Sequence, residues 1–241
     1  MARNNELECV FAINNFFKGA SNLKLVASNC DVQLIEEAFK SAVSNDKEYD
    51  FPDFLYRDGL IEHFIVTSST EDRGAGFKKF EAKSNKENKK YFDEQDQELL
   101  KSNPEPQTLY TVSRESKYSK NNYSNFLTNF KTHFDSHLHS LFKTGIKNKT
   151  VIFLIENQGG RLCVYENERF KEFYILSHDK NILNHLKSNK QAVNYIVFIS
   201  ADSFEIIDTS KIDDLLVIAK EGLDIRGGSI TNIELKLYID L

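Results

Sequence analysis

Residues that break or cross-link a chain are scarce: there are 3 prolines, 10 glycines and 3 cysteines among 241 residues. So little proline and glycine excludes a collagen-like or low-complexity chain. The cysteines, Cys9, Cys30 and Cys163, are far apart and odd in number, which argues against a disulfide framework and against a cysteine-based zinc knuckle. We expect them to be reduced and to serve mostly as packing residues.

Long apolar runs are also missing. No stretch approaches the roughly 20 residues of a transmembrane helix, and no apolar segment typical of a signal peptide follows Met1. With 40% hydrophobic and 28% charged residues, the chain can bury a sizeable core and is not disordered. The sequence therefore predicts a soluble, cytoplasmic protein.

Charge is spread unevenly around a formal net charge of −5. Residues 78–90 carry a net +4 and residues 110–149 a net +5, which leaves −14 for the rest of the chain. Phosphate contacts need local Lys and Arg rather than overall positive charge, so these segments could form a groove that binds DNA. The residues expected to contact phosphates are Lys83, Lys86, Lys89, Lys90, Arg114, Lys117 and Lys120. Alternatively, both segments are ordinary solvated helix faces.

Hydrophobic periodicity predicts an α/β protein with a mixed central sheet flanked by helices and a strand-rich C-terminal half. Residues 151–155 are apolar throughout, so this strand should be buried on both faces. We expect one domain over residues 1–241, or a division into residues 1–110 and 111–241. Helices are predicted over residues 6–18, from Asp31 to Asn45, 122–143, 179–188 and 211–221, with an exposed helix or mobile loop over 71–103. Strands are predicted over residues 23–27, 151–156, 162–166, 172–177, 193–200, 204–209 and 233–240.

A hairpin is predicted over residues 51–67, because an Asp-Gly pair at Asp58-Gly59 separates two β-rich runs. It would carry Asp53 on its first strand and Glu62 on its second. Side chains on adjacent antiparallel strands lie within about 5.5 Å of each other, so these carboxylates could hold one divalent cation. Such an ion activates a bound water and neutralises charge on a phosphate, as phosphodiester hydrolysis requires. The alternative is an ordinary hairpin whose carboxylates face water.

This arrangement resembles the PD-(D/E)xK superfamily, the restriction-endonuclease-like nucleases. The resemblance rests on Pro52-Asp53 and on Glu62-His63-Phe64, preceded by a helix containing Glu6 and Glu8 and followed by a helix and further strands. It implies a restriction-endonuclease-like core, a Mg²⁺ or Mn²⁺ cofactor and DNA as the substrate. It would make Asp53 and Glu62 metal ligands, the backbone carbonyl of His63 a third ligand, and Glu8 or Glu6 an auxiliary acid.

The chain departs from the family pattern at Phe64, where the family has a lysine two residues after the second acid. Lysine serves there because an ammonium group can orient the nucleophile and stabilise the reacting phosphate. The resemblance therefore implies that Lys78 or Lys79 supplies this group from the next segment. Without such a lysine, the site would bind DNA or metal without cleaving DNA.

Two further features carry polar side chains. His133 and His137, in the run HFDSHLH, share a helix face and could bind zinc, but Phe134 stands where a metalloprotease motif has glutamate. We therefore favour a solvated or partner-facing helix surface. Glu156, at the end of the apolar strand, is the best additional acidic candidate, because that end of a sheet often opens on a crevice; otherwise it is a solvated carboxylate.

Two hypotheses about function remain open. The first is a metal-dependent nuclease, or a DNA-binding derivative of that fold, in a restriction, repair or mobile-element setting. The second is a non-catalytic protein-interaction module, which could be a homo-oligomer.

Overall fold

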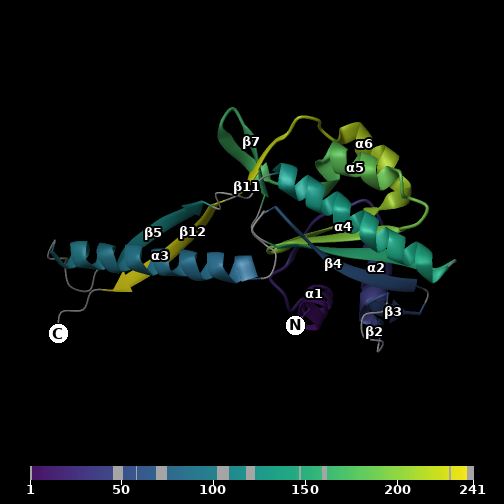
Figure 1. Cartoon of the computed structure of the whole chain (residues 1–241), viewed down its shortest axis with the longest axis horizontal. Coiled ribbons are helices and arrows are strands. Elements are labelled where there is room, and N and C mark those ends of the chain that lie inside the picture. Colours follow the sequence, from purple (N-terminus) through teal and green to yellow (C-terminus); the bar gives the residue numbers. More distant parts are fainter. Residues whose placement is uncertain are drawn as a thin grey trace.

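A mixed seven-stranded sheet forms the centre of the protein, with helices on both of its faces (Figure 1). The structure is a computed structural model that describes residues 2–45, 51–57, 59–68, 75–101, 109–117, 123–146, 148–158, 162–227 and 229–237. In spatial order the strands are β1 (Lys24–Ser28), β10 (Ser203–Asp208), β9 (Tyr195–Ser200), β6 (Thr150–Gln158), β4 (Gly59–Thr67), β3 (Phe54–Tyr56) and β2 (Val43–Ser44). The predicted α/β class with a mixed central sheet is confirmed.

Strand β6 occupies the middle of the sheet and pairs in parallel with β4 on one side and β9 on the other. All five residues of the run 151–155 are buried, as the apolar pattern predicted. Alternate residues enter two different cores: Phe153 and Ile155 face one, and Ile152 and Leu154 face the other. The neighbouring strands β4 and β6 thus come from the first and second halves of the chain.

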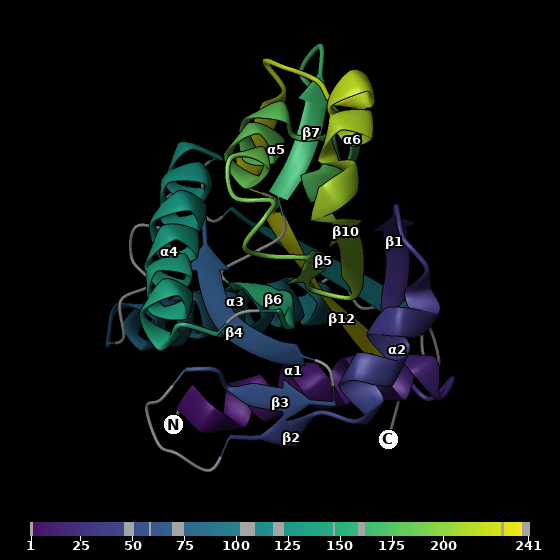
Figure 2. The same ribbon diagram turned by 90° about the vertical axis from the view of Figure 1, so that its right-hand side faces the viewer.

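Helices form the two outer layers (Figure 1). One face is covered by α4 (Tyr123–Thr144), α5 (Lys180–Lys187) and α6 (Ile212–Ile218), and the other by α1 (Ala2–Phe17) and α2 (Val32–Lys40). Helix α4 lies beside β4, as Figure 2 shows. A stripe of apolar residues at helical spacing faces the sheet, and its members are Phe126, Phe130, Phe134, Leu138 and Leu141.

Smaller sheets complete the fold. A three-stranded sheet in the order β11-β7-β8 comprises β11 (Asp224–Gly227), β7 (Leu162–Glu166) and β8 (Arg169–Phe173). Helix α3 (Ala75–Lys101) and the strand pair β5 (Leu109–Lys117) and β12 (Ser229–Leu237) extend away from the central sheet as an arm (Figure 1). For residues 75–101, the helix rather than the loop alternative is confirmed. No helix in these described segments is both long and apolar enough to cross a membrane.

Two predicted elements are wrong in part. The helix capped by Asp31 ends at Lys40 rather than near Asn45, because Val43 and Ser44 pair with β3. The strand predicted over residues 172–177 ends at Phe173, and a 3₁₀ turn, η1 (Leu176–His178), follows it. A second 3₁₀ turn, η2 (Thr209–Lys211), precedes α6.

Candidate functional site

The β3–β4 hairpin brings Asp53 and Glu62 together, and each carboxylate accepts a hydrogen bond from the backbone of the facing segment. The backbone N–H of Asp53 donates to Glu62 Oε2 at 3.2 Å, and the backbone N–H of His63 donates to Asp53 Oδ2 at 2.7 Å. Phe54 pairs with Ile61 in the ladder, so Asp53 and Glu62 occupy the next positions along the two strands. The two acids singled out in the sequence therefore belong to one site.

Gly59 lets this hairpin pack against the centre of the sheet. A Cβ at this position would lie 2.2 Å from the carbonyl oxygen of Thr150 in β6 and 2.4 Å from the ring of Tyr56. Any larger residue would push β4 away from β6, since a backbone oxygen cannot move aside like the end of a side chain. Glycine is thus required at the point where the turn enters β4.

Both carboxyl groups are held away from water. Glu62 is only 5% exposed, so the alternative of a solvent-facing carboxylate is wrong for this residue. Burial raises the pKa of Glu62 to about 8. Burial, with the charge of Glu62, raises the pKa of Asp53 to about 6. Near neutral pH the pair therefore keeps a proton that a bound cation would displace.

Helix α4 adds His137 to the pair. Its Nδ1 lies 2.6 Å from Glu62 Oε1, and the ring of Phe64 stacks on the imidazole with centroids 4.5 Å apart and planes at 15°. Burial lowers the pKa of His137, which favours a neutral imidazole in this hydrogen bond with Glu62. The expectation of a solvated helix surface is wrong at His137. The signal that could have found it is its position three residues after buried Phe134, at the edge of the apolar stripe.

The auxiliary residues expected from the sequence are placed differently. The charge of Glu6 contributes to the raised pKa of Glu62, whereas Glu8 lines a pocket together with Cys9 and Glu156. Lys78, Lys79 and Lys83 belong to α3, but their side chains lie outside the described residues. The side chains of Arg114 and Lys117 in β5, and all of Lys120, lie outside them too.

A second polar cluster occupies the opposite face of β4. His63 follows Glu62 directly, so its side chain points to the α1 side of the sheet, where Nε2 lies 3.2 Å from Glu156 Oε2. Cys9 Sγ donates to the same oxygen at 3.3 Å, and Gln158 Nε2 donates to Glu156 Oε1 at 2.9 Å. Burial alone would raise the pKa of Glu156, but these hydrogen bonds lower it overall. Cys9, expected to be a packing residue, is thus part of a polar cluster.

An open pocket of about 460 Å³ adjoins this cluster. It is formed between α1 and the ends of β6 and β9, and its walls include Glu8, Cys9, Ala12, Glu156 and Ile199. The crevice expected at the end of the apolar strand is therefore present, and Glu156 lies in its wall.

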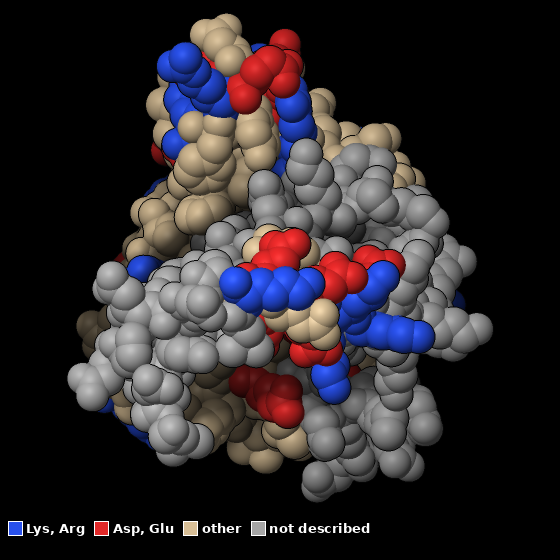
Figure 3. All heavy atoms as spheres, turned by 90° about the vertical axis from the view of Figure 1, so that its left-hand side faces the viewer, with Lys and Arg blue, Asp and Glu red and all other residues tan. Residues whose placement is uncertain are grey.

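The exposed lysines of α3 stand among acidic residues. Lys86, Lys89 and Lys90 are exposed, and Lys90 Nζ lies 3.6 Å from Glu94 Oε1. Figure 3 views the molecule from the side of the arm and shows the described Lys and Arg residues interspersed with Asp and Glu. On this face the described residues form a mixed surface rather than a basic patch.

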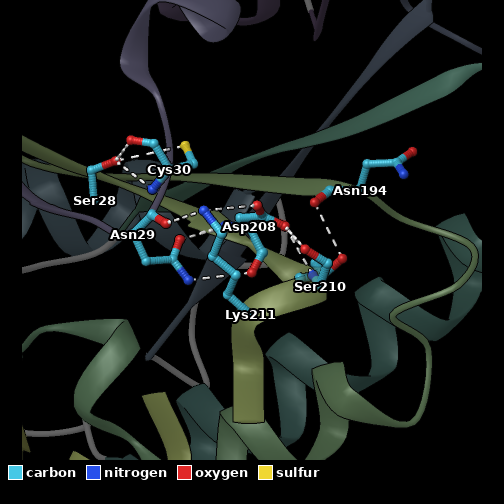
Figure 4. Close-up of polar contacts among 8 residues, drawn as sticks. Ser28, Asn29, Cys30, Asn194, Asp208, Ser210 and Lys211 are labelled. Atoms are coloured by element: carbon cyan, nitrogen blue, oxygen red, sulfur yellow. Dashed lines mark hydrogen bonds and ion pairs between the residues drawn. The ribbon is translucent and has the colours of Figure 1, made fainter. Parts of the chain in front are cut away.

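A third group of polar residues joins the ends of β1 and β10 (Figure 4). Asn29 Oδ1 accepts from the backbone N–H of Asp208 at 2.6 Å, and Lys211 Nζ donates to the Asn29 carbonyl at 3.1 Å. Asp208 Oδ1 accepts from the backbone N–H of Ser210 at 2.9 Å and so caps η2. Because these bonds satisfy backbone groups at the strand ends, we assign this group a structural role.

Comparison with protein-family models, curated proteins and solved structures found no match. Function is therefore inferred from the geometry of the two clusters on β4.

Proposed function

We propose that the protein is a metal-dependent nuclease that hydrolyses DNA phosphodiester bonds at Asp53 and Glu62. The observation that carries the proposal is the pair of neighbouring carboxyl groups at the β3–β4 hairpin, each of which accepts a backbone N–H, with His137 against Glu62. The order of elements supports it: a helix precedes the hairpin, and α4 leads from the arm to β6, which pairs with β4. A helix before the hairpin and a helix with further strands after it are the features on which the resemblance to PD-(D/E)xK nucleases rests, and other elements lie between them in this chain.

A Mg²⁺ or Mn²⁺ ion fits this donor set. Both ions prefer carboxylate oxygens, and each such oxygen has two lone pairs, so Asp53 and Glu62 can still accept a cation beside their hydrogen bonds. The raised pKa values of both acids indicate a site that lacks compensating positive charge. When bound, the ion would supply an activated water and neutralise charge on the phosphate.

His137 is the residue we propose for the task that lysine performs in the family. An ionised Glu62 accepts a hydrogen bond from Nδ1–H, which leaves Nε2 of the neutral imidazole free to take a proton from the attacking water. Phe64, which replaces the family lysine, holds the imidazole by stacking on it. Lys78 and Lys79 remain the alternative source of this group.

Plasmid and single-stranded DNA incubated with Mg²⁺, Mn²⁺ or EDTA test the proposal. We expect cleavage with either ion, none with EDTA or in Glu62→Gln, and a loss of roughly 10²-fold in His137→Gln. The matched control is Glu36→Gln on α2, which removes an acid that pairs with Lys40 near the surface and lies outside both clusters on β4. Metal-dependent cleavage that survives Glu62→Gln would refute the proposal. DNA retention without cleavage, weakening steeply with salt, would instead indicate a binding derivative of this fold.

One observation favours the protein-interaction module as a second candidate. Leu7 and Phe11 lie one turn apart on α1 and are 49% and 64% exposed. Apolar side chains grouped on a helix surface are typical of interaction sites. A protein that neither cleaves nor retains DNA, and that forms oligomers lost in Phe11→Ser, would support this second candidate.

A further inference from the structure

We propose that Cys9, His63 and Glu156 form a zinc site on the α1 face of the sheet. The three residues come from α1, β4 and β6 and are far apart in the sequence. Sγ of Cys9 and Nε2 of His63 lie 3.3 and 3.2 Å from the same Glu156 oxygen, and one ligand atom from each residue lies within 4.8 Å of the others. Bonds of about 2.0–2.3 Å in a tetrahedral zinc site place ligand atoms roughly 3.3–3.8 Å apart. A small adjustment of the side chains would therefore admit the ion.

The donor set selects the metal. Thiolate and imidazole ligands favour Zn²⁺ over Mg²⁺ and Ca²⁺, which prefer oxygen ligands. One thiolate and one carboxylate balance the charge of a divalent ion. Binding would form one bond from the metal to each of Cys9, His63 and Glu156, with the proton of the Cys9 thiol released to solvent.

The surroundings of the three residues resemble those of a built site. Cys9 and His63 are buried, at 8% and 5% exposure, so packing restrains their side chains. Gln158 Nε2 donates to the Glu156 oxygen that does not face Cys9 and His63, and hydrogen bonds of this kind orient a metal-binding carboxylate. The nearby pocket reaches Cys9 and Glu156 from solvent. With three protein ligands, the fourth position would be left to water or a small anion from this pocket, as in catalytic rather than structural zinc sites.

The side chains of this site are separate from the carboxyl pair proposed for DNA cleavage, although the backbone N–H of His63 donates to Asp53. Glu62 and His63 are neighbours in β4 but face opposite sides of the sheet. The site near Glu62 offers mainly oxygen ligands to a hard cation, whereas this one offers sulfur, nitrogen and oxygen. Loss of one site should therefore leave metal binding at the other intact.

Titration of the metal-free protein with Co²⁺ and Zn²⁺ tests the proposal. We expect one equivalent of Co²⁺ to produce a thiolate-to-metal charge-transfer band, and Zn²⁺ to displace it. The band should be absent in Cys9→Ser and unchanged in Cys163→Ser, which alters another buried cysteine. A protein without the band, or the same band in Cys9→Ser, would overturn the proposal.

A second variant keeps the test valid if Cys9→Ser fails to fold. Glu156→Gln preserves the thiol and the shape of the side chain, and circular dichroism would check that it folds. We expect its Zn²⁺ affinity to fall by more than about 100-fold, since even outer-shell partners of a metal site contribute about 10–100-fold. Unchanged Zn²⁺ affinity in folded Glu156→Gln would overturn the proposal. Glu62→Gln should bind Zn²⁺ like the wild type, whatever its effect on DNA cleavage.

Discussion

The buried carboxyl groups on the two faces of the sheet, Glu62 in β4 and Glu156 in β6, have pKa values that shift in opposite directions. On the α4 side, Glu62 is the more deeply buried, with 7% of its side chain exposed against 20% for Glu156, and its pKa is raised. On the α1 side, His63, Gln158 and Cys9 form hydrogen bonds to Glu156, and these lower its pKa despite burial. The sign of the shift thus depends on which donors face the carboxylate as well as on its burial. We infer that the first face suits exchange of a proton for a hard cation, and the second suits a borderline metal held by mixed ligands.

Replacing the two acids on the α4 face should abolish the function proposed for that face and leave the α1 face unchanged. We expect Asp53→Asn with Glu62→Gln to reduce DNA cleavage by at least about 10³-fold, to below detection as in Glu62→Gln alone, because the metal ion supplies several kcal/mol of transition-state stabilisation. The Co²⁺ charge-transfer band at Cys9 should persist. Cleavage rates and Co²⁺ spectra measured on one preparation check both statements, and loss of the band in a folded variant would mean that the two faces are not independent.

Glu205, a buried carboxyl group outside both proposed sites, shows the effect of burial on a pKa. It lies in β10, is 2% exposed and accepts hydrogen bonds from the backbone N–H groups of Leu176 and Ser177. Burial raises its pKa to about 7, although nothing suggests a catalytic role. Between its ordinary pKa and about 7, the unfolded chain loses this proton while the folded protein keeps it. The free energy of unfolding should therefore fall as pH rises through this window, by about 3 kcal/mol, and stay level above it.

Denaturant unfolding of the wild type and Glu205→Gln at several pH values from 4.5 to 7.5 checks this prediction. The variant cannot ionise, so its stability should lack this decrease, while cleavage per folded molecule should match the wild type. Equal pH slopes for the two proteins would contradict the assignment. Because Glu205 has a raised pKa without a proposed role in cleavage, a raised pKa alone does not identify the site at Glu62.

Local sequence patterns predicted the elements that position the site, but not all of the residues that form it. The Asp-Gly pair at residues 58–59 was enough to predict the hairpin that joins Asp53 and Glu62. The contact of His137 with Glu62 could not be predicted, because it depends on how α4 docks on β4. Cys9, His63 and Glu156 converge only through tertiary packing, since they lie on three separate elements.

Some strands also escaped sequence analysis. The two residues of β2 are too few to form an alternating pattern, and they are held by pairing with β3. Strand β5, in the middle of the chain, is polar along most of its length and is paired with β12, which lies more than 100 residues later. Pairing partners distant in sequence thus define these strands more than their own composition does.

Gly59→Ala should weaken both faces together, because β4 carries Glu62 and His63. The added methyl group would meet the carbonyl oxygen of Thr150, and overpacking of this kind costs about 1–3 kcal/mol. For a chain of this size, each kcal/mol lowers Tm by about 2–4 °C. Thermal unfolding checks the prediction, and an unchanged Tm would show that β4 can shift relative to β6 without cost.

The smallest effect is expected for Gln158→Ala. It tests whether Glu156 binds a metal ion or only accepts hydrogen bonds from two donors. Gln158→Ala removes the hydrogen bond to Glu156 Oε1 but none of the three proposed ligands. We expect Zn²⁺ affinity to fall about 10-fold, the lower end of what outer-shell partners contribute, with the Co²⁺ band retained. Competition with a chromophoric chelator measures this change, and Gln95→Ala on α3, where the amide donates to Glu98, is the matched control. If Gln158→Ala and Gln95→Ala bind Zn²⁺ equally well, Gln158 does not orient a ligand, and the α1 face has no outer shell of the kind proposed.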